Sequence, residues 1–312
     1  MEVRMKKKLF VMGLVLCMAA EAGCGAKGET EPAGNGISDG PAQDEGVGTA
    51  DPDAGISDGK DGEADPLMET ITLRIVDGAE TGSLVLAGEG AGDVYTLYVG
   101  DADVFVDGTL SNASVIEDGM VAEIRYTGGI MESWPGQIGN VESISVYSRG
   151  TQQNPLGEYY DLCGLYLQVL NDLWDVDSGL NDGAVYVSVD LSDAPGELTE
   201  GEKAAIAWIF ACEHDVLPLT LTYSELAEQG YLSEWREFED GEQKIYEWKD
   251  GVIFSIKAEE SGETEIYSLP VLRFHAQKWR SPLGAYFYED CKAVWPEGGS
   301  WESYSVGAEA IS

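Results

Sequence analysis

The chain has 312 residues, of which 57 are acidic and only 18 are basic, so its formal net charge at pH 7 is −39. Such an acidic chain excludes nucleic-acid binding, because neutralising phosphates requires a basic face. It leaves neutral ligands, cations and basic peptides as candidate partners. The 44% of hydrophobic residues, with 8 Trp and 15 Tyr, suffices to build one large core or two of ordinary size.

The N-terminal residues predict export from the cytoplasm. Basic residues at Arg4 and at 6–8 precede the apolar stretch Leu9–Cys24, which ends in small residues. This order is typical of a secretory signal peptide, here residues 1–23. Its apolar run is shorter than the roughly 20 residues that a mature membrane helix needs.

The triplet Ala22-Gly23-Cys24 closes the apolar stretch. It resembles the lipobox of bacterial lipoproteins, and the resemblance implies a lipidated Cys24 whose two acyl chains anchor the protein to the membrane. We then expect an extracytoplasmic location on the cell membrane of a Gram-positive bacterium. Glu21 stands where the family pattern has an apolar residue, so an alternative stays open. In that alternative, cleavage before Gly23 releases a secreted protein.

Residues 24–66 are predicted to form a disordered acidic linker. The segment consists largely of Gly, Ala, Asp, Glu, Pro and Ser and has almost no large apolar residue. It cannot bury enough apolar surface to offset the entropy lost on ordering, and its like charges extend it. We expect it to hold the folded part of the chain away from the membrane.

The sequence pattern of residues 67–148 predicts a small β-barrel-like domain. Short runs with hydrophobic alternation, such as Thr70–Val76 and Val94–Val99, are separated by glycine-rich turns. The run Ile116–Ile124, followed by Glu132–Gln137 and a last strand, resembles the small OB-fold-like domains of Gram-positive lipoproteins. The resemblance implies a small all-β barrel and no defined function.

Residues 155–312 predict an α+β domain with helices on one face of a mostly antiparallel sheet. Apolar residues at helical spacing indicate a helix within 156–174. Two capping boxes, Thr199–Glu202 and Thr222–Glu225, indicate further helix starts. The predicted strands are 185–191, 219–221, 244–248, 252–257, 265–269, 271–279 and 285–295. The fold class expected for the whole chain is therefore α+β.

Cys163 and His275 form one candidate catalytic pair. Cys163 lies near a predicted helix start, and His275 lies on a later predicted strand. This order resembles that of NlpC/P60-type cell-wall cysteine peptidases. The resemblance implies a nucleophilic Cys163 with His275 as its base, and a cell-wall cysteine hydrolase as the function. The alternative is a buried cysteine and an ordinary strand histidine.

No metal site and no cofactor are expected. Cys212 and His214 lack the ligand spacings of zinc sites, and the acidic run 175–183 lacks the glycine and glutamate positions of an EF-hand loop. After Cys24 only Cys163, Cys212 and Cys291 remain, an odd number, so at most one disulfide can form among them.

Aromatic side chains mark the best candidate ligand-binding surface. Trp279, Tyr286 and Tyr288 belong to two consecutive predicted strands, whose turn places Trp279 opposite Ala285. Trp134 is a second candidate, able to stack on a sugar or peptide or, alternatively, to pack over the end of the barrel. The expected partner is an envelope glycan, peptide or protein. Because no complete catalytic set is present in the sequence, we expect a non-enzymatic binding protein.

Overall fold

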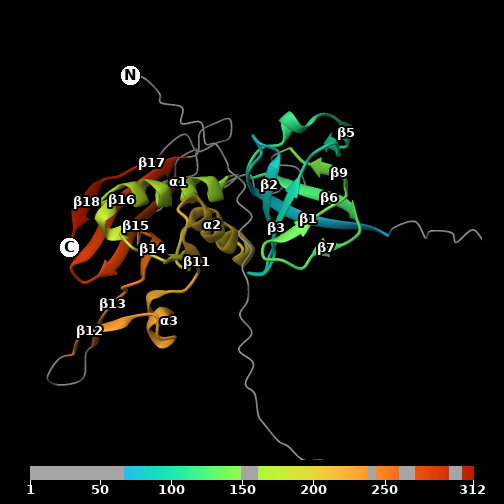
Figure 1. Cartoon of the computed structure of the whole chain (residues 1–312). Coiled ribbons are helices and arrows are strands. Elements are labelled where there is room, and N and C mark those ends of the chain that lie inside the picture. Colours follow the sequence, from blue (N-terminus) through green and yellow to red (C-terminus); the bar gives the residue numbers. More distant parts are fainter. Residues whose placement is uncertain (1–66, 149–160, 238–243, 260–270, 295–303) are drawn as a thin grey trace, which may run out of the picture. The chain divides into compact units, whose positions relative to one another are not determined.

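A computed structural model describes residues 67–148, 161–237, 244–259, 271–294 and 304–312. These residues form a strand-rich fold with two mixed sheets and few helices, which confirms the predicted α+β class (Figure 1). The predicted signal peptide, Cys24, the acidic linker and the predicted strand 265–269 lie outside the described residues.

The first sheet has nine strands, coloured blue to green in Figure 1. Its elements are β1 (Met68–Asp77), β2 (Ser83–Ala87), β3 (Val94–Tyr98), β4 (Asp103–Val106), β5 (Thr109–Leu110), the 3₁₀ helix η1 (Ala113–Val115), β6 (Val121–Thr127), β7 (Ile130–Met131), β8 (Gly136–Ile138) and β9 (Val141–Val146). Their order across the sheet is β5-β4-β9-β6-β1-β2-β3-β8-β7. β3 runs parallel to β8, and β4 runs parallel to β9, whereas the other neighbours are antiparallel.

Buried and exposed side chains alternate along β1, so that one face of the first sheet is buried. Leu73 and Ile75 are buried, whereas Thr72 is exposed, as the period of two in a strand requires. The tight return from β1 to β2 depends on Gly78, whose φ is +98°. A Cβ at this position would lie only 1.9 Å from the carbonyl oxygen of Ser83, so any larger residue would disrupt the turn.

The remaining described residues form helices and a second group of strands. The helices are α1 (Leu162–Asp175), the 3₁₀ helix η2 (Ser178–Asn181), α2 (Glu200–Glu213) and α3 (Tyr223–Glu228). The strands are β10 (Tyr186–Asp190), β11 (Leu217–Leu219), β12 (Ser233–Glu237), β13 (Lys244–Glu247), β14 (Gly251–Ala258), β15 (Val271–Ser281), β16 (Gly284–Val294), β17 (Tyr304–Ser305) and β18 (Ala308–Ile311). None of the described helices has the length and apolar character that crossing a membrane requires.

The second sheet has the order β11-β10-β14-β15-β16-β17, and β18 also pairs with β16. β14, β15 and β16 form an antiparallel meander, but β10 runs parallel to both β11 and β14. The sheet that was predicted to be mostly antiparallel is therefore mixed, and β10 is the strand that departs from the prediction. The physical reason is that α2 connects β10 to β11, and a helical crossover returns the chain in the same direction. A separate hairpin pairs β13 with β12, a strand that the hydrophobic pattern did not predict.

Helices α1 and α2 pack on one face of the second sheet. Val187 and Val189 of β10 and Phe254 of β14 belong to one hydrophobic core with both helices. Phe210 of α2 meets Phe254 edge to face, with ring centroids 4.8 Å apart. Because side chains alternate along a strand, Asp190 and the polar residues beside it project from the opposite face.

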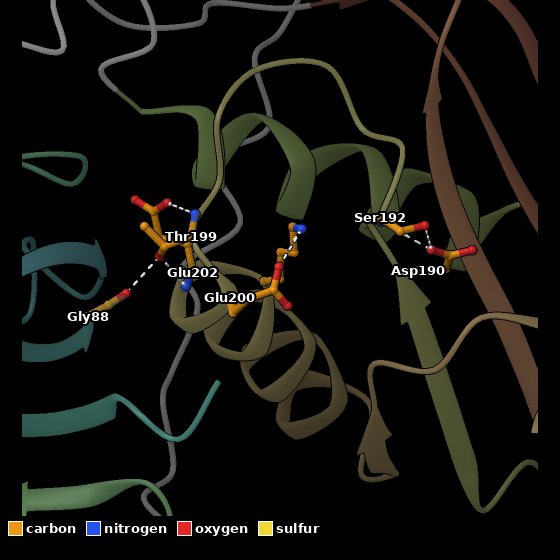
Figure 2. A network of polar contacts seen from close by, with 7 residues as sticks. Gly88, Asp190, Ser192, Thr199, Glu200 and Glu202 are labelled. Carbon is orange, nitrogen blue, oxygen red and sulfur yellow. Dashed lines mark hydrogen bonds and ion pairs between the residues drawn. The ribbon is translucent and has the colours of Figure 1, made fainter. Parts of the chain in front are cut away.

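The start of α2 contacts the β2–β3 loop of the first sheet. The hydroxyl of Thr199, which caps α2, donates a hydrogen bond to the carbonyl oxygen of Gly88 at 2.7 Å (Figure 2). Glu202 completes the predicted capping box, which is confirmed, and forms an ion pair with Arg74 of β1. Gly201 permits this approach, because a Cβ there would lie 2.4 Å from the same carbonyl oxygen. Buried residues of both sheets, α1 and α2 share one hydrophobic core.

Candidate functional site

A pocket of about 280 Å³ lies on the face of the second sheet opposite α1 and α2. It is lined by Asp190, Tyr223, Ile253, Ser255, Lys257, Gln277 and Trp279. The short helix α3 provides the tyrosine, and strands β10, β14 and β15 provide the other six residues. The pocket therefore joins chain segments that are far apart in the sequence.

Strand register aligns three polar side chains, which we call the polar row. Asp190 of β10 lies opposite Ser255 of β14, which lies opposite Gln277 of β15. Neighbouring strands are about 4.8 Å apart, so one small ligand can contact all three side chains. Ile253 and Trp279 lie opposite each other and form the next row on the same face.

Asp190 ends β10 and is only 7% exposed. Its Oδ1 accepts hydrogen bonds from the backbone N–H of Ser192 at 3.1 Å and from the hydroxyl of Ser192 at 2.6 Å (Figure 2). In the described part of the chain, its Oδ2 accepts no hydrogen bond and no cationic side chain forms an ion pair with it. The turn through Ser192 thus fixes the carboxyl group and leaves one oxygen for a ligand.

Ser255 lies in the middle of the polar row and is 2% exposed. Its hydroxyl oxygen has no hydrogen-bond partner among the described residues. Burying a polar group without a partner costs about 1–3 kcal/mol, which is why such groups are rare. A polar ligand atom that reaches this hydroxyl would remove the penalty.

Trp279 and Tyr223 form the aromatic wall of the pocket. Their rings meet edge to face, with centroids 5.1 Å apart and an interplanar angle of 82°. A capping box between Thr222 and Glu225 starts α3 and so positions Tyr223. Burial raises the pKa of the Tyr223 phenol, so it stays protonated at neutral pH. An apolar wall beside a few convergent polar groups is the usual composition of a small-molecule site.

Lys257 lies two residues beyond Ser255 on β14 and therefore on the same face. Its side chain is 49% exposed, and its Nζ is 3.9 Å from Oδ2 of Asp193. An exposed ion pair of this kind contributes little to stability. The Lys257 ammonium group can therefore turn to a ligand at the rim of the pocket.

The structure separates the four predicted ligand-binding aromatic residues. Trp279 lines the pocket, and its predicted pairing with Ala285 is confirmed. Tyr288 is on the face of the second sheet that α1 and α2 cover, which we call the helix face. Its hydroxyl donates to a backbone carbonyl of α1 at 3.5 Å, and the ring of Tyr286 packs against the ring of Tyr288. Trp134 lies in the connection between β7 and β8 of the first sheet and is 50% exposed.

Cys163 and His275 lie on opposite faces of the second sheet. Cys163 is 1% exposed within α1, and burial, followed by the charges of Glu202 and Asp161, raises the pKa of its thiol. A buried thiol with a raised pKa does not supply the thiolate that attacks a substrate. His275 is on the pocket face, where its Nδ1 accepts a hydrogen bond from the backbone N–H of Asp290 at 3.3 Å. This arrangement gives the predicted catalytic pair no support.

The other sequence candidates have ordinary packing roles. Within the described ranges, no group of three or more His, Cys, Asp or Glu side chains could hold a metal ion. His214 stacks on Trp174 with ring centroids 4.1 Å apart, and its Nε2 lies 2.8 Å from Oδ1 of Asn171. The three cysteines at described positions are free thiols.

Most of the pocket was missed by sequence reasoning, which singled out only Trp279 among the lining residues. A signal was present in the sequence, because Ser255 interrupts a strand that is otherwise rich in buried apolar residues, and Asp190 ends another such strand. Polar residues at such positions need a partner or a ligand. What the pattern does not reveal is that β10 and β14 are neighbours.

In comparisons with known proteins, no family model, no curated protein and no solved structure matches this chain. The chemistry of the pocket is therefore the guide to the function of this protein.

Proposed function

We propose that this protein binds a small polar ligand in the pocket between β10, β14, β15 and α3, and that it catalyses no reaction on it. One observation carries the proposal: the buried Ser255 hydroxyl lines the pocket and has no hydrogen-bond partner among the described residues. A site built around an unpaired polar group favours the ligand that pairs with it and rejects one that does not.

The surroundings of Ser255 support binding rather than catalysis. A serine nucleophile needs a base within hydrogen-bond reach, and in the described structure Ser255 has none. Gln277 and Asp190 flank it with further hydrogen-bonding groups, and Trp279 supplies an apolar surface. The volume of about 280 Å³ is near the lower end of the roughly 300–1,000 Å³ typical of ligand pockets, so the ligand is small.

A ligand screen by thermal denaturation tests this proposal. The probes are the twenty L-amino acids, glycyl dipeptides, glucose and N-acetylglucosamine. We expect at least one probe to raise the Tm, because a ligand at 100 times its Kd adds about 2.7 kcal/mol to stability. Gln277→Leu should abolish the shift, and Gln168→Leu, on the exposed side of α1, should retain it. The proposal is wrong if no probe raises the Tm or if the shift survives Gln277→Leu.

We also propose that the protein works outside the cytoplasm, anchored to the membrane of a Gram-positive cell through a lipidated Cys24. The basic start, the apolar run and the small residues before Cys24 support this proposal. The acidic segment 24–66 would then separate the pocket from the membrane surface. Intact-mass measurement of the exported protein should show a diacylglyceryl group on Cys24. A free N-terminal Gly23 would instead identify a secreted protein.

We infer an OB-like barrel for the first sheet. β1 pairs with β2 and β2 pairs with β3, both antiparallel, and β3 pairs in parallel with β8. At the other side of β1, β6 pairs with β1 and β9 pairs with β6. Only Gly139 and Asn140 separate β8 from β9, so the two can act as one bent strand that closes the ring. This connectivity supports a five-stranded Greek-key barrel. The net charge of −39 argues for a spacer or protein-interaction role rather than nucleic-acid binding.

A further inference from the structure

We propose that the ligand of this pocket is zwitterionic, with an ammonium group held by the polar row and a carboxylate held by Lys257. A free amino acid and a short peptide share this chemistry. The inference rests on the proposed function, because it uses the same pocket, and it adds the class of ligand.

Asp190 places a buried carboxyl group in the lining of the pocket. The residue is 7% exposed, and its hydrogen bonds from Ser192 reach only Oδ1. Burying a carboxylate is costly unless a cation or hydrogen-bond donors compensate its charge. Lys257, the lysine among the lining residues, forms its ion pair with Asp193 instead. A ligand cation at Oδ2 would therefore complete the site.

The acceptors of the polar row match the donors of an ammonium group. A primary ammonium has three N–H donors. The polar row offers three acceptors, which are Oδ2 of Asp190, the unpaired hydroxyl oxygen of Ser255 and the amide oxygen of Gln277. Trp279 and Tyr223 border the same pocket, and aromatic rings attract cations through their faces.

Lys257 lies on the same strand as Ser255 of the polar row, at the rim of the pocket. A strand rises about 3.3 Å per residue, so the Cα atoms of Ser255 and Lys257 are roughly 6.6 Å apart on the same face. The long lysine side chain can bridge the remaining distance to a carboxylate close to the bound ammonium. Its contact with Asp193 is 3.9 Å long and exposed, so a ligand carboxylate can replace it.

Charge and size argue against neutral sugars, purely anionic ligands and large ligands. A neutral sugar would leave the Asp190 carboxylate without a cation, and a ligand with only negative charge would be repelled by a chain with a net charge of −39. An ammonium group is attracted by the same field. The small pocket limits the ligand to a single amino acid or a very short peptide.

Isothermal titration calorimetry with the purified full protein tests the inference. The probes are free L-amino acids and glycyl dipeptides, and the tightest binder is compared with its N-acetyl and C-terminal amide derivatives, with glucose and with N-acetylglucosamine. We expect N-acetylation to weaken binding by at least about 10-fold, because hydrogen bonds to charged groups are the strong ones. Amidation should weaken it less, because Lys257 is at the exposed rim. Comparing the free amino acids with the glycyl dipeptides shows whether the ligand is a single amino acid or a short peptide.

Two variants test whether Asp190 binds the ammonium group of the ligand and Lys257 binds its carboxylate. Asp190→Asn should reduce affinity for the free probe as much as N-acetylation does, and should reduce affinity for the acetylated probe no further. Lys257→Met should weaken binding of the carboxylate form and leave the amide unchanged. Asp101→Asn, at an exposed position outside the pocket lining, is the matched control for the loss of one negative charge, and the Tm of each variant without ligand checks folding.

The possible outcomes separate this inference from the proposed function. If a sugar or an N-acetylated probe binds as tightly as the zwitterion, or if Asp190→Asn binds normally, the pocket is a binding site and the zwitterion inference is wrong. If no probe of any class binds, both the inference and the proposed function fail.

Discussion

Asp118 lies in the turn before β6, where its Oδ1 accepts a hydrogen bond from the backbone N–H of Ala79 at 3.0 Å. Burial raises the pKa of Asp118 to about 7, against the effect of this hydrogen bond and with a smaller contribution from the charge of Asp77. In the unfolded chain the carboxyl group titrates near 3.9. Between pH ~4 and 7 the folded protein therefore binds more protons, and the contribution of Asp118 to stability falls as the pH rises through this window.

Asp118→Asn should raise the free energy of unfolding by roughly 1–2 kcal/mol at pH 8 and leave it nearly unchanged at pH 4. The asparagine keeps an acceptor for the Ala79 N–H but has no charge to bury. Urea denaturation at the two pH values measures the difference. Asp101→Asn, at an exposed position, controls for the loss of one negative charge. Equal gains from the two variants would show that burial of Asp118 is not the cause.

Lys278 shows why some single residues could not be predicted from the sequence. Alternation along β15 places it on the helix face, where the pattern favours an apolar side chain. It is nevertheless buried, and its Nζ donates to the carbonyl oxygen of Asp177 at 3.1 Å and to Oδ1 of Asn181 at 3.3 Å, just beyond the end of α1. A helix C-terminus attracts cations. Asn181 is 97 residues away in the chain, so no local pattern reveals the partner.

At the scale of elements, the start of α2 is where added bulk should disrupt packing most directly. A Cβ on Gly201 would lie 2.4 Å from the carbonyl oxygen of Gly88 and 3.0 Å from that of Gly90. Both are backbone atoms, which cannot rotate away as a side chain can. Gly201→Ala is therefore expected to lower the free energy of unfolding by about 1–3 kcal/mol, although alanine favours helices.

Thermal denaturation of Gly201→Ala against the unmodified protein measures this loss. Gly179→Ala in η2 is the matched control, because its Cβ would meet nothing closer than 3.9 Å. The control should melt within a degree or two of the unmodified protein, since exposed substitutions usually change stability by under about 0.5 kcal/mol. Equal melting temperatures for the two variants would mean that α2 and the β2–β3 loop separate at no cost.

Elements with a local signal could be predicted from the sequence, and contacts between distant elements could not. The capping boxes at Thr199 and Thr222 place α2 and α3 correctly, because each motif spans only four residues. The parallel pairing of β10 depends on the route of the chain through α2, which no residue pattern specifies. The pocket was missed for the same reason, since Asp190 meets Ser255 only because β10 lies beside β14.

At the scale of the whole molecule, one hydrophobic core includes buried residues of both sheets. The ion pair between Arg74 of β1 and Glu202 of α2 lies at this junction, with side chains 11% and 5% exposed. Parts that share a continuous core unfold together, whereas domains that merely touch unfold in separate steps. We therefore expect a single calorimetric transition whose van't Hoff and calorimetric enthalpies agree. Two resolved transitions would contradict a shared core.

Variants of Arg74 and Glu202 test how much their ion pair between β1 and α2 contributes to the stability of the protein. Arg74→Met leaves the Glu202 carboxylate buried without its cation, which should destabilise the protein by about 3–5 kcal/mol. Adding Glu202→Gln removes that charge but keeps a side chain that can accept and donate in the capping box, so the double variant should regain much of the loss. Scanning calorimetry of both variants measures the effect. A double variant no more stable than Arg74→Met would mean that the arginine acts through its packing, not through its charge.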